Sequence, residues 1–176
     1  MKKVKIFDCI FSFVLCFFIH NLYNNFPCFF TSIFSPVNES IIEHMKLFIT
    51  SLTIISLFDY TIFKHKKINL NNIFLNLFLS ISLCIIFYLI IFIPIYNEIG
   101  ENFIFSIILL FITLILSQIL SYFIYNFKNF KYLNYISLLL VILIYIVFTY
   151  FSYNPIFDYL FFDIVDNKYG INIYID

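Results

Sequence analysis

The sequence predicts an all-α fold: a polytopic bundle of about five transmembrane helices in a single membrane domain, residues 1–176. Hydrophobic residues make up 63% of the chain and charged residues only 11%, whereas a soluble domain carries roughly a quarter charged residues. A soluble fold of this composition would expose larger apolar patches than monomers tolerate. Five stretches also reach the length of about 20 mostly apolar residues that a helix needs to cross a bilayer. They lack the apolar–polar alternation of membrane-barrel strands, so helices are expected.

The expected spans follow from apolar content along the chain. They cover residues 6–23, 41–63, 73–96, 103–126 and 132–150, and an outer C-terminal segment follows at 151–176. The first span comes after Met1-Lys2-Lys3-Val4-Lys5, which resembles the start of a signal peptide. A cleavage site needs small residues, and Phe17-Phe18-Ile19-His20-Asn21 stands there instead. This span is therefore expected to be retained as a helix.

The lysines predict the orientation of the spans, because cytoplasmic loops of membrane proteins carry an excess of Lys and Arg. Eight of the ten lysines precede the first span or lie in the second–third and fourth–fifth connections: Lys2, Lys3, Lys5, Lys64, Lys66, Lys67, Lys128 and Lys131. Eight of the ten acids fall on the opposite side: Glu39, Glu43, Glu98, Glu101, Asp158, Asp163, Asp166 and Asp176. The sequence therefore predicts a multi-pass protein of the cell membrane, with a cytoplasmic N-terminus and a non-cytoplasmic C-terminus.

Charge and cysteine content limit the expected partners. The formal net charge is zero, and no basic groove accompanies the aromatic residues, so no nucleic-acid partner is expected. The lipid bilayer is the expected surrounding. The four cysteines (Cys9, Cys16, Cys28 and Cys84) form no CxxC pair, and we expect them to act as small apolar side chains.

A concentrated block of polar residues opens the second span. Its members are Asn38, Glu39, Ser40, Glu43, His44 and Lys46. Ser40-x-x-Glu43 fits a helix capping box. At 100° per residue, Glu39, Glu43 and Lys46 share one stripe, and Ser40 and His44 form the adjacent stripe. Lys46 lies about 9 Å below Ser40, and at that depth its ammonium must either snorkel outward or pair with a carboxylate such as Glu43. The block is therefore either a functional site or a set of fold-locking ion pairs.

Two other segments are expected to reach the same outer surface. His20 ends the first span, and the segment after the fifth span is expected to fold back over the helix ends as a lid. Taken alone, His20 is typical of an interfacial side chain and Asp163 of a solvated acid. Together with His44, they form a candidate metal-ligand set.

A family resemblance rests on these same residues. Pro36-Val37-Asn38-Glu39-Ser40, followed by Glu43-His44-Met45-Lys46, resembles the signature of a family of small bacterial multi-pass membrane proteins of unknown function. His20, Leu160-Phe161-Phe162-Asp163 and Tyr169-Gly170 are similar to further positions of that family. The resemblance implies a membrane location and makes Tyr169 a candidate binding residue. Relatives tend to have a Pro-Pro-His-like stretch where this chain has Pro155-Ile156-Phe157, which argues against a third histidine ligand.

The middle of the chain carries weaker polar signals. Ser40-x-x-x-His44 is similar to a motif of membrane-embedded zinc hydrolases such as the alkaline ceramidases, but their His-x-x-x-His pair in the last helix is missing. Asp59 lies about 22 Å from His44 along the same helix, and it is interpreted as an interfacial acid near Lys64. The spans are otherwise expected to be largely free of charge. Helix packing is the expected role of Ser117, Gln118 and Ser121.

The sequence is compatible with two functions. The first is an integral membrane protein whose outer pocket binds a lipid headgroup or a small solute through Asn38, Glu39, Ser40, Lys46 and Tyr169. The second is a membrane-embedded, metal-dependent hydrolase acting on a lipid or envelope substrate. It would hold a divalent metal such as zinc on His20 and His44 with Asp163 or Glu39, and use Glu43 as general base.

Overall fold

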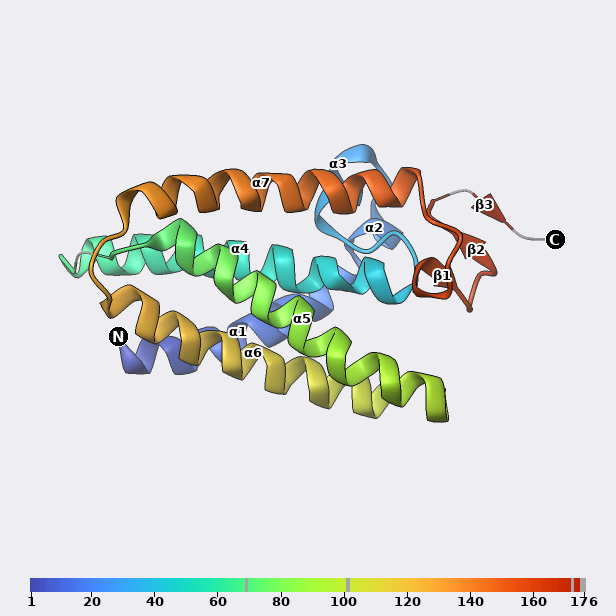
Figure 1. Ribbon diagram of the computed structural model, residues 1–176, viewed down its shortest axis with the longest axis horizontal. Helices are drawn as coiled ribbons and strands as arrows, with labels where there is room; N and C mark the ends of the chain where they lie inside the picture. Colours follow the sequence, from blue (N-terminus) through green and yellow to red (C-terminus); the bar gives the residue numbers. More distant parts are fainter. Residues whose placement is uncertain (69, 101, 172, 175–176) are drawn as a thin grey trace.

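The computed structural model describes residues 1–68, 70–100, 102–171 and 173–174. It confirms the all-α bundle (Figure 1). Among these residues, five helices are long and apolar enough to cross a membrane. They are α1 (Lys2–His20), α4 (Ile41–His65), α5 (Ile73–Ile99), α6 (Phe103–Asn126) and α7 (Lys131–Tyr153). Their bounds agree with the predicted spans to within a few residues, and α1 begins at the opposite end of the bundle from the C-terminal strands (Figure 1).

Helix α4 is the buried helix of the bundle. It packs against α1, α5 and α7, and 61% of its most apolar window is buried, against 28% or less in the other four spans. It also has the lowest mean hydropathy of the five. In lipid this order is expected, because polar side chains must find partners inside the bundle while the lipid-facing helices stay apolar. The least hydrophobic span is therefore the one at the centre.

The lateral surface of the bundle, which would face lipid, is apolar. Helix α7 buries only Ser137, Val141 and Ser152 among its 23 residues. Large side chains such as Leu139 and Ile146 are more than half exposed. A soluble protein would not expose apolar faces of this size, so the exposed side chains support the membrane assignment.

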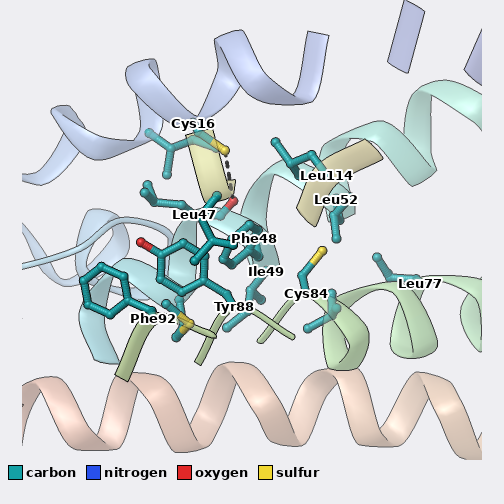
Figure 2. Packing of buried hydrophobic residues seen from close by; sticks show 14 of the residues in the cluster. Cys16, Leu47, Phe48, Ile49, Leu52, Leu77, Cys84, Tyr88, Phe92 and Leu114 are labelled. Carbon is teal, nitrogen blue, oxygen red and sulfur yellow. Dashed lines mark hydrogen bonds between the residues drawn. The ribbon is translucent and has the colours of Figure 1, made fainter. Parts of the chain in front are cut away.

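The apolar core lies between α1, α4, α5 and α6 (Figure 2). Phe48 of α4 meets Tyr88 of α5 edge to face, with ring centroids 5.5 Å apart. Cys16 of α1 and Cys84 of α5 are buried in this core as free thiols. The Cys16 thiol lies 3.8 Å from the Leu47 carbonyl oxygen (Figure 2). Both thiols therefore pack as small groups in the core, as expected from the sequence, whereas the expectation is wrong for Cys28, which is exposed.

The segment after α7 folds back as predicted, and it contains a small sheet that the sequence did not predict. A 3₁₀ turn (Tyr159–Phe161) leads into three antiparallel strands, β1 (Phe162–Asp163), β2 (Lys168–Tyr169) and β3 (Ile173–Tyr174). Gly170 has φ +54°, and a Cβ there would lie 2.6 Å from the Ser152 carbonyl oxygen. This close approach docks the sheet on the end of α7. Glu101 and Asp176, two acids assigned to the outer side, lie outside the described residues.

Candidate metal centre

The chain between α1 and α4 fixes the end of α1 against the start of α4. Two short helices, α2 (Leu22–Asn25) and α3 (Phe29–Phe34), form this connection. The Ser35 hydroxyl donates to the Ile19 carbonyl at 2.7 Å and accepts from the Tyr23 amide at 3.0 Å. Because Ile19 precedes His20, these bonds hold the last residue of α1 next to the polar block.

Half of the predicted capping box is present at the start of α4. The Ser40 hydroxyl accepts from the Glu43 amide at 3.4 Å. Glu43 does not return the bond to Ser40; its carboxylate accepts from the Val37 amide at 3.1 Å. The Ser40 amide donates instead to the Asn38 side-chain oxygen at 3.0 Å. Ser40 and Asn38, both predicted as binding residues, therefore shape the turn that presents Glu39.

His20, Glu39 and His44 converge on one point at this turn. The Nε2 atoms of His20 and His44 are 3.1 Å apart. The Glu39 Oε2 atom lies 3.3 Å from each of them. The other ring nitrogen of His44, Nδ1, lies 2.8 Å from the Ser40 carbonyl oxygen. That carbonyl accepts a hydrogen bond from Nδ1–H, so a neutral His44 ring would present its Nε2 lone pair to a metal ion, and only the protonated ring can donate from Nε2 to Glu39.

The three ligand atoms form a triangle with the dimensions of a zinc site. Zinc binds His nitrogen and carboxylate oxygen at about 2.0–2.1 Å in a tetrahedron, whose edges are about 1.6 times that length, or roughly 3.3 Å. The sides of the observed triangle are 3.1, 3.3 and 3.3 Å. Three protein ligands fill one tetrahedral face and leave the fourth position open, as in catalytic zinc sites. The three side chains are 27–34% exposed, so this position is accessible.

The charge state of Glu39 suits a metal ligand. Hydrogen bonds from His20 and then His44 hold the pKa of the Glu39 carboxyl well below its ordinary value of 4.5, against a smaller opposing effect of burial. The carboxylate therefore stays ionised throughout the neutral range. A metal ion requires its carboxylate ligands in this form.

Asp163 lies beside the triangle, not within it. Its carboxylate is fully buried and accepts hydrogen bonds from three backbone amides: Glu39 at 3.1 Å, Val165 at 2.9 Å and Asp166 at 3.1 Å. The interpretation of Asp163 as a solvated acid is therefore wrong. Among the described residues, the structure groups His20 and His44 with Glu39 as possible metal ligands. Asp163 holds the Glu39 backbone and closes the turn after β1.

Glu43 and Lys46 face away from the triangle and pair with each other. The Lys46 ammonium lies 2.7 Å from the Glu43 carboxylate, and the two side chains are 1% and 5% exposed. The ammonium also donates to the Ser32 carbonyl at 2.7 Å. The Ser152 hydroxyl of α7 donates to Glu43 at 2.7 Å. Neither residue is among the described residues that line the cavity beside the triangle, so fold locking describes this pair better than a general base or a phosphate ligand.

A cavity of about 380 Å³ opens beside the triangle, within the size range of small-molecule sites. His20, Asn21, Glu39 and His44 form its polar part. Most of the remaining wall is apolar and comes from α1, α4, α5, α6 and the β1–β2 turn: Cys16, Phe17, Ile41, Met45, Leu47, Phe48, Tyr88, Phe92, Tyr96, Phe103, Ser106, Ile107, Leu110, Phe162, Ile164 and Val165. Tyr169 packs against Phe157 and Phe162, with ring centroids 5.2 and 5.1 Å away, and supports this turn from behind.

A second polar cluster, at the other end of α1 and α4, contradicts the expectation of charge-free spans. Asp59 is buried and pairs with Lys5, so its interpretation as an interfacial acid near Lys64 is wrong. Lys5 is inside the bundle, not in a cytoplasmic flank, and it donates to Gln118 at 3.3 Å. The signal was available in the sequence: Lys5, Asp8 and Ser12 recur at the three- to four-residue spacing of one helix face.

Comparison with known families gives one result. The family model described as a family of unknown function (DUF6512) matches residues 1–171. The chain belongs to the DUF6512 family. The match covers α1 to β2 and therefore every residue of the triangle and the cavity of this DUF6512 protein. Neither the curated proteins nor the solved structures give a match.

Proposed function

We propose that this DUF6512 protein is a multi-pass protein of a bacterial cell membrane that binds a divalent metal ion, zinc in the first instance, through His20, Glu39 and His44. The observation that carries the proposal is the triangle of ligand atoms with sides of 3.1, 3.3 and 3.3 Å. Two imidazoles and a carboxylate are ligands that zinc accepts. The lysine distribution supports a location of the site at the non-cytoplasmic face.

The cavity gives the bound metal a role in holding a ligand. Its wall is mostly apolar, and among the described residues that line it there is no lysine. A metal with an open position supplies the missing positive charge at the polar end of the cavity. The combination suits a lipid, with an anionic headgroup on the metal and part of an acyl chain among Phe48, Tyr88 and Phe92.

Metal binding is tested on the purified protein by elemental analysis and by zinc titration after chelation. We expect one zinc per chain, and loss of that zinc in His20→Ala and in His44→Ala. The matched control is His65→Ala, because His65 is an exposed histidine in the last turn of α4, far from the triangle. Wild-type protein that takes up no zinc, manganese or iron would refute the proposal. So would zinc that is retained by the His44→Ala variant.

A metal-dependent hydrolase is the second candidate, favoured by the open fourth position of the three-ligand set. A metal-bound water with its pKa lowered to about 7 would be the nucleophile. Glu43 is paired with Lys46, so in this candidate Glu43 would not serve as the general base. Release of product from labelled phospholipid vesicles by zinc-loaded protein, absent in Glu39→Gln, separates the hydrolase from a binding protein.

A further inference from the structure

The second polar cluster contains more negative than positive charge in a place that water does not reach. Its charged members are Lys5 and Asp8 of α1 and Asp59 of α4. The Lys5 ammonium lies 3.2 Å from the Asp8 carboxylate and contacts the Asp59 carboxylate more closely. Asp8 and Asp59 are 1% exposed or less and Lys5 is 6% exposed. One ammonium facing two carboxylates leaves one negative charge uncompensated.

The groups packed around the cluster do not supply the missing charge. From α6, the Tyr125 hydroxyl donates to Asp59 at 3.1 Å, and the Gln118 amide oxygen accepts from Lys5 at 3.3 Å. From α5, Asn76 donates to Ser121 of α6 at 3.0 Å. All of these partners are uncharged, and the Cys9 thiol next to Asp8 is neutral or negative. Lys5 is therefore the cation that the described residues offer to the two carboxylates.

Oxygen atoms without partners surround a small cavity at this place. Asp59, Asn76 and Ser80 line a void of about 10 Å³, and each contributes a buried oxygen that accepts no hydrogen bond from the described residues. The Asp8 Oδ1 atom is also buried without a hydrogen-bond partner among the described residues, and Asp8 Oδ2 has the Lys5 ammonium at 3.2 Å. A void of this size holds about one water molecule. A water would satisfy the hydrogen bonds but would leave a negative charge buried without a counter-charge, which is unfavourable inside a membrane protein.

We propose that the Lys5–Asp8–Asp59 cluster is a binding site for one small monovalent cation, either a sodium ion or a proton. A single positive charge neutralises the cluster, whereas a divalent ion would reverse its charge. A sodium ion would take the oxygens of Asp59, Asn76 and Ser80, since hard cations bind carboxylate, amide and hydroxyl oxygen. A proton would sit on one of the unpartnered carboxylate oxygens. The site is independent of the metal centre, which lies about 22 Å away along α4, fifteen residues at 1.5 Å each.

Two measurements on the full-length protein in detergent test this site. The first is the infrared band of a protonated carboxylic acid at neutral pH, in choline chloride and in sodium chloride of equal ionic strength. The second is the thermal midpoint in the same two salts. Asp8→Asn and Asp59→Asn identify the source of each signal. Glu98→Gln is the control, because Glu98 is an exposed carboxylate near the end of α5.

The expected results distinguish the two cations. A sodium site gives a higher thermal midpoint in sodium than in choline, and sodium at one hundred times its Kd shifts the unfolding equilibrium about 100-fold. A proton site gives a carboxylic acid band that is present in both salts and absent in Asp8→Asn or Asp59→Asn. A wild-type protein with neither the band nor the sodium dependence overturns the proposal.

Asp8→Asn gives an independent check on the charge count. Asparagine at this position removes the surplus charge, so the variant should be at least as stable as the wild type and should lose the sodium effect. Asp59→Asn removes the closer partner of Lys5 and should be less stable than Asp8→Asn. Equal destabilisation by the two substitutions would contradict the charge count.

Discussion

Lys46→Met tests the claim that Glu43 and Lys46 lock the fold and take no part in metal or ligand binding. The substitution keeps most of the side-chain volume and removes the ammonium. It leaves the Glu43 carboxylate buried without its counter-charge, since Glu43 is 5% exposed. Removing one partner of a buried ion pair costs about 3–5 kcal/mol. The Ser32 carbonyl also loses its donor at 2.7 Å.

The double variant Glu43→Gln/Lys46→Met isolates the charge from the rest of the loss. The glutamine oxygen can accept from the Val37 amide, which now bonds to Oε2 of Glu43. Its NH2 group takes the place of Oε1 and can donate to the Ser152 hydroxyl, which can still donate to the Phe148 carbonyl. The remaining cost is the loss of the bonds that the ammonium donates to the Ser32 carbonyl, the Ser35 carbonyl and the Ser152 hydroxyl. A buried acceptor that loses its partner costs about 1–3 kcal/mol. The double variant should therefore be more stable than Lys46→Met alone.

Reversible unfolding in mixed micelles measures both variants, and zinc titration on the same samples measures the site. Zinc affinity should be unchanged in both, because neither residue is among the described residues that line the cavity. Lys168→Met is the control, since Lys168 pairs with Asp166, which is 54% exposed, and an exposed pair contributes at most about 1 kcal/mol. A double variant as unstable as Lys46→Met would refute the ion-pair reasoning. Loss of zinc binding in a folded variant would show that Lys46 contributes to the metal site.

Three further predictions concern the end of the bundle that carries the triangle, which we propose to be non-cytoplasmic. Cys28 is exposed, and its Thr31 hydrogen bonds lower its thiol pKa, so an impermeant maleimide should label intact cells, and Cys28→Ser should abolish that labelling. The next prediction concerns the free energy of unfolding of metal-free wild type and Glu39→Gln, measured across pH. The stability advantage of the wild type should be complete above pH 4.5 and should fall as the pH drops toward the lower pKa that Glu39 has in the folded state. Gly170→Ala should expose the C-terminal strands to limited proteolysis, because its Cβ would meet the Ser152 carbonyl at 2.6 Å.

Apolar content was enough to predict the spans, because length and hydropathy set what can cross a bilayer. It was not enough to assign faces at the start of α4. The prediction grouped Glu39, Glu43 and Lys46 on one stripe, which assumes helical geometry from Glu39 onward. The helix begins at Ile41, so Glu39 lies in the bend before the helix, outside the 100° periodicity. Its carboxylate faces His20 and His44, while Glu43 and Lys46 face α3 and α7.

The buried acids were missed for a different reason. Asp59 and Asp163 each bind a partner that is distant in the sequence. Asp59 pairs with Lys5, 54 residues earlier, and Asp163 accepts from the Glu39 amide, 124 residues earlier. No local pattern encodes such a pairing. Lysine counting also treated Lys5 as a loop residue, although the face that it shares with Asp8 and Ser12 predicts a buried position for all three.

Polar contacts at both ends explain how α1 is held although most of its surface faces outward. In lipid, apolar side chains gain little from leaving the solvent, because the solvent is apolar as well. Helix association then depends on close packing and on polar groups that find partners only inside the bundle. α1 has one such set at each end, Lys5 and Asp8 with Asp59, and His20 with Glu39 and His44. Between them the contacts with α4 are mainly apolar, through residues such as Cys16 and Leu47. The few polar residues of α1 therefore determine its register against α4, and that register brings His20 to the cavity.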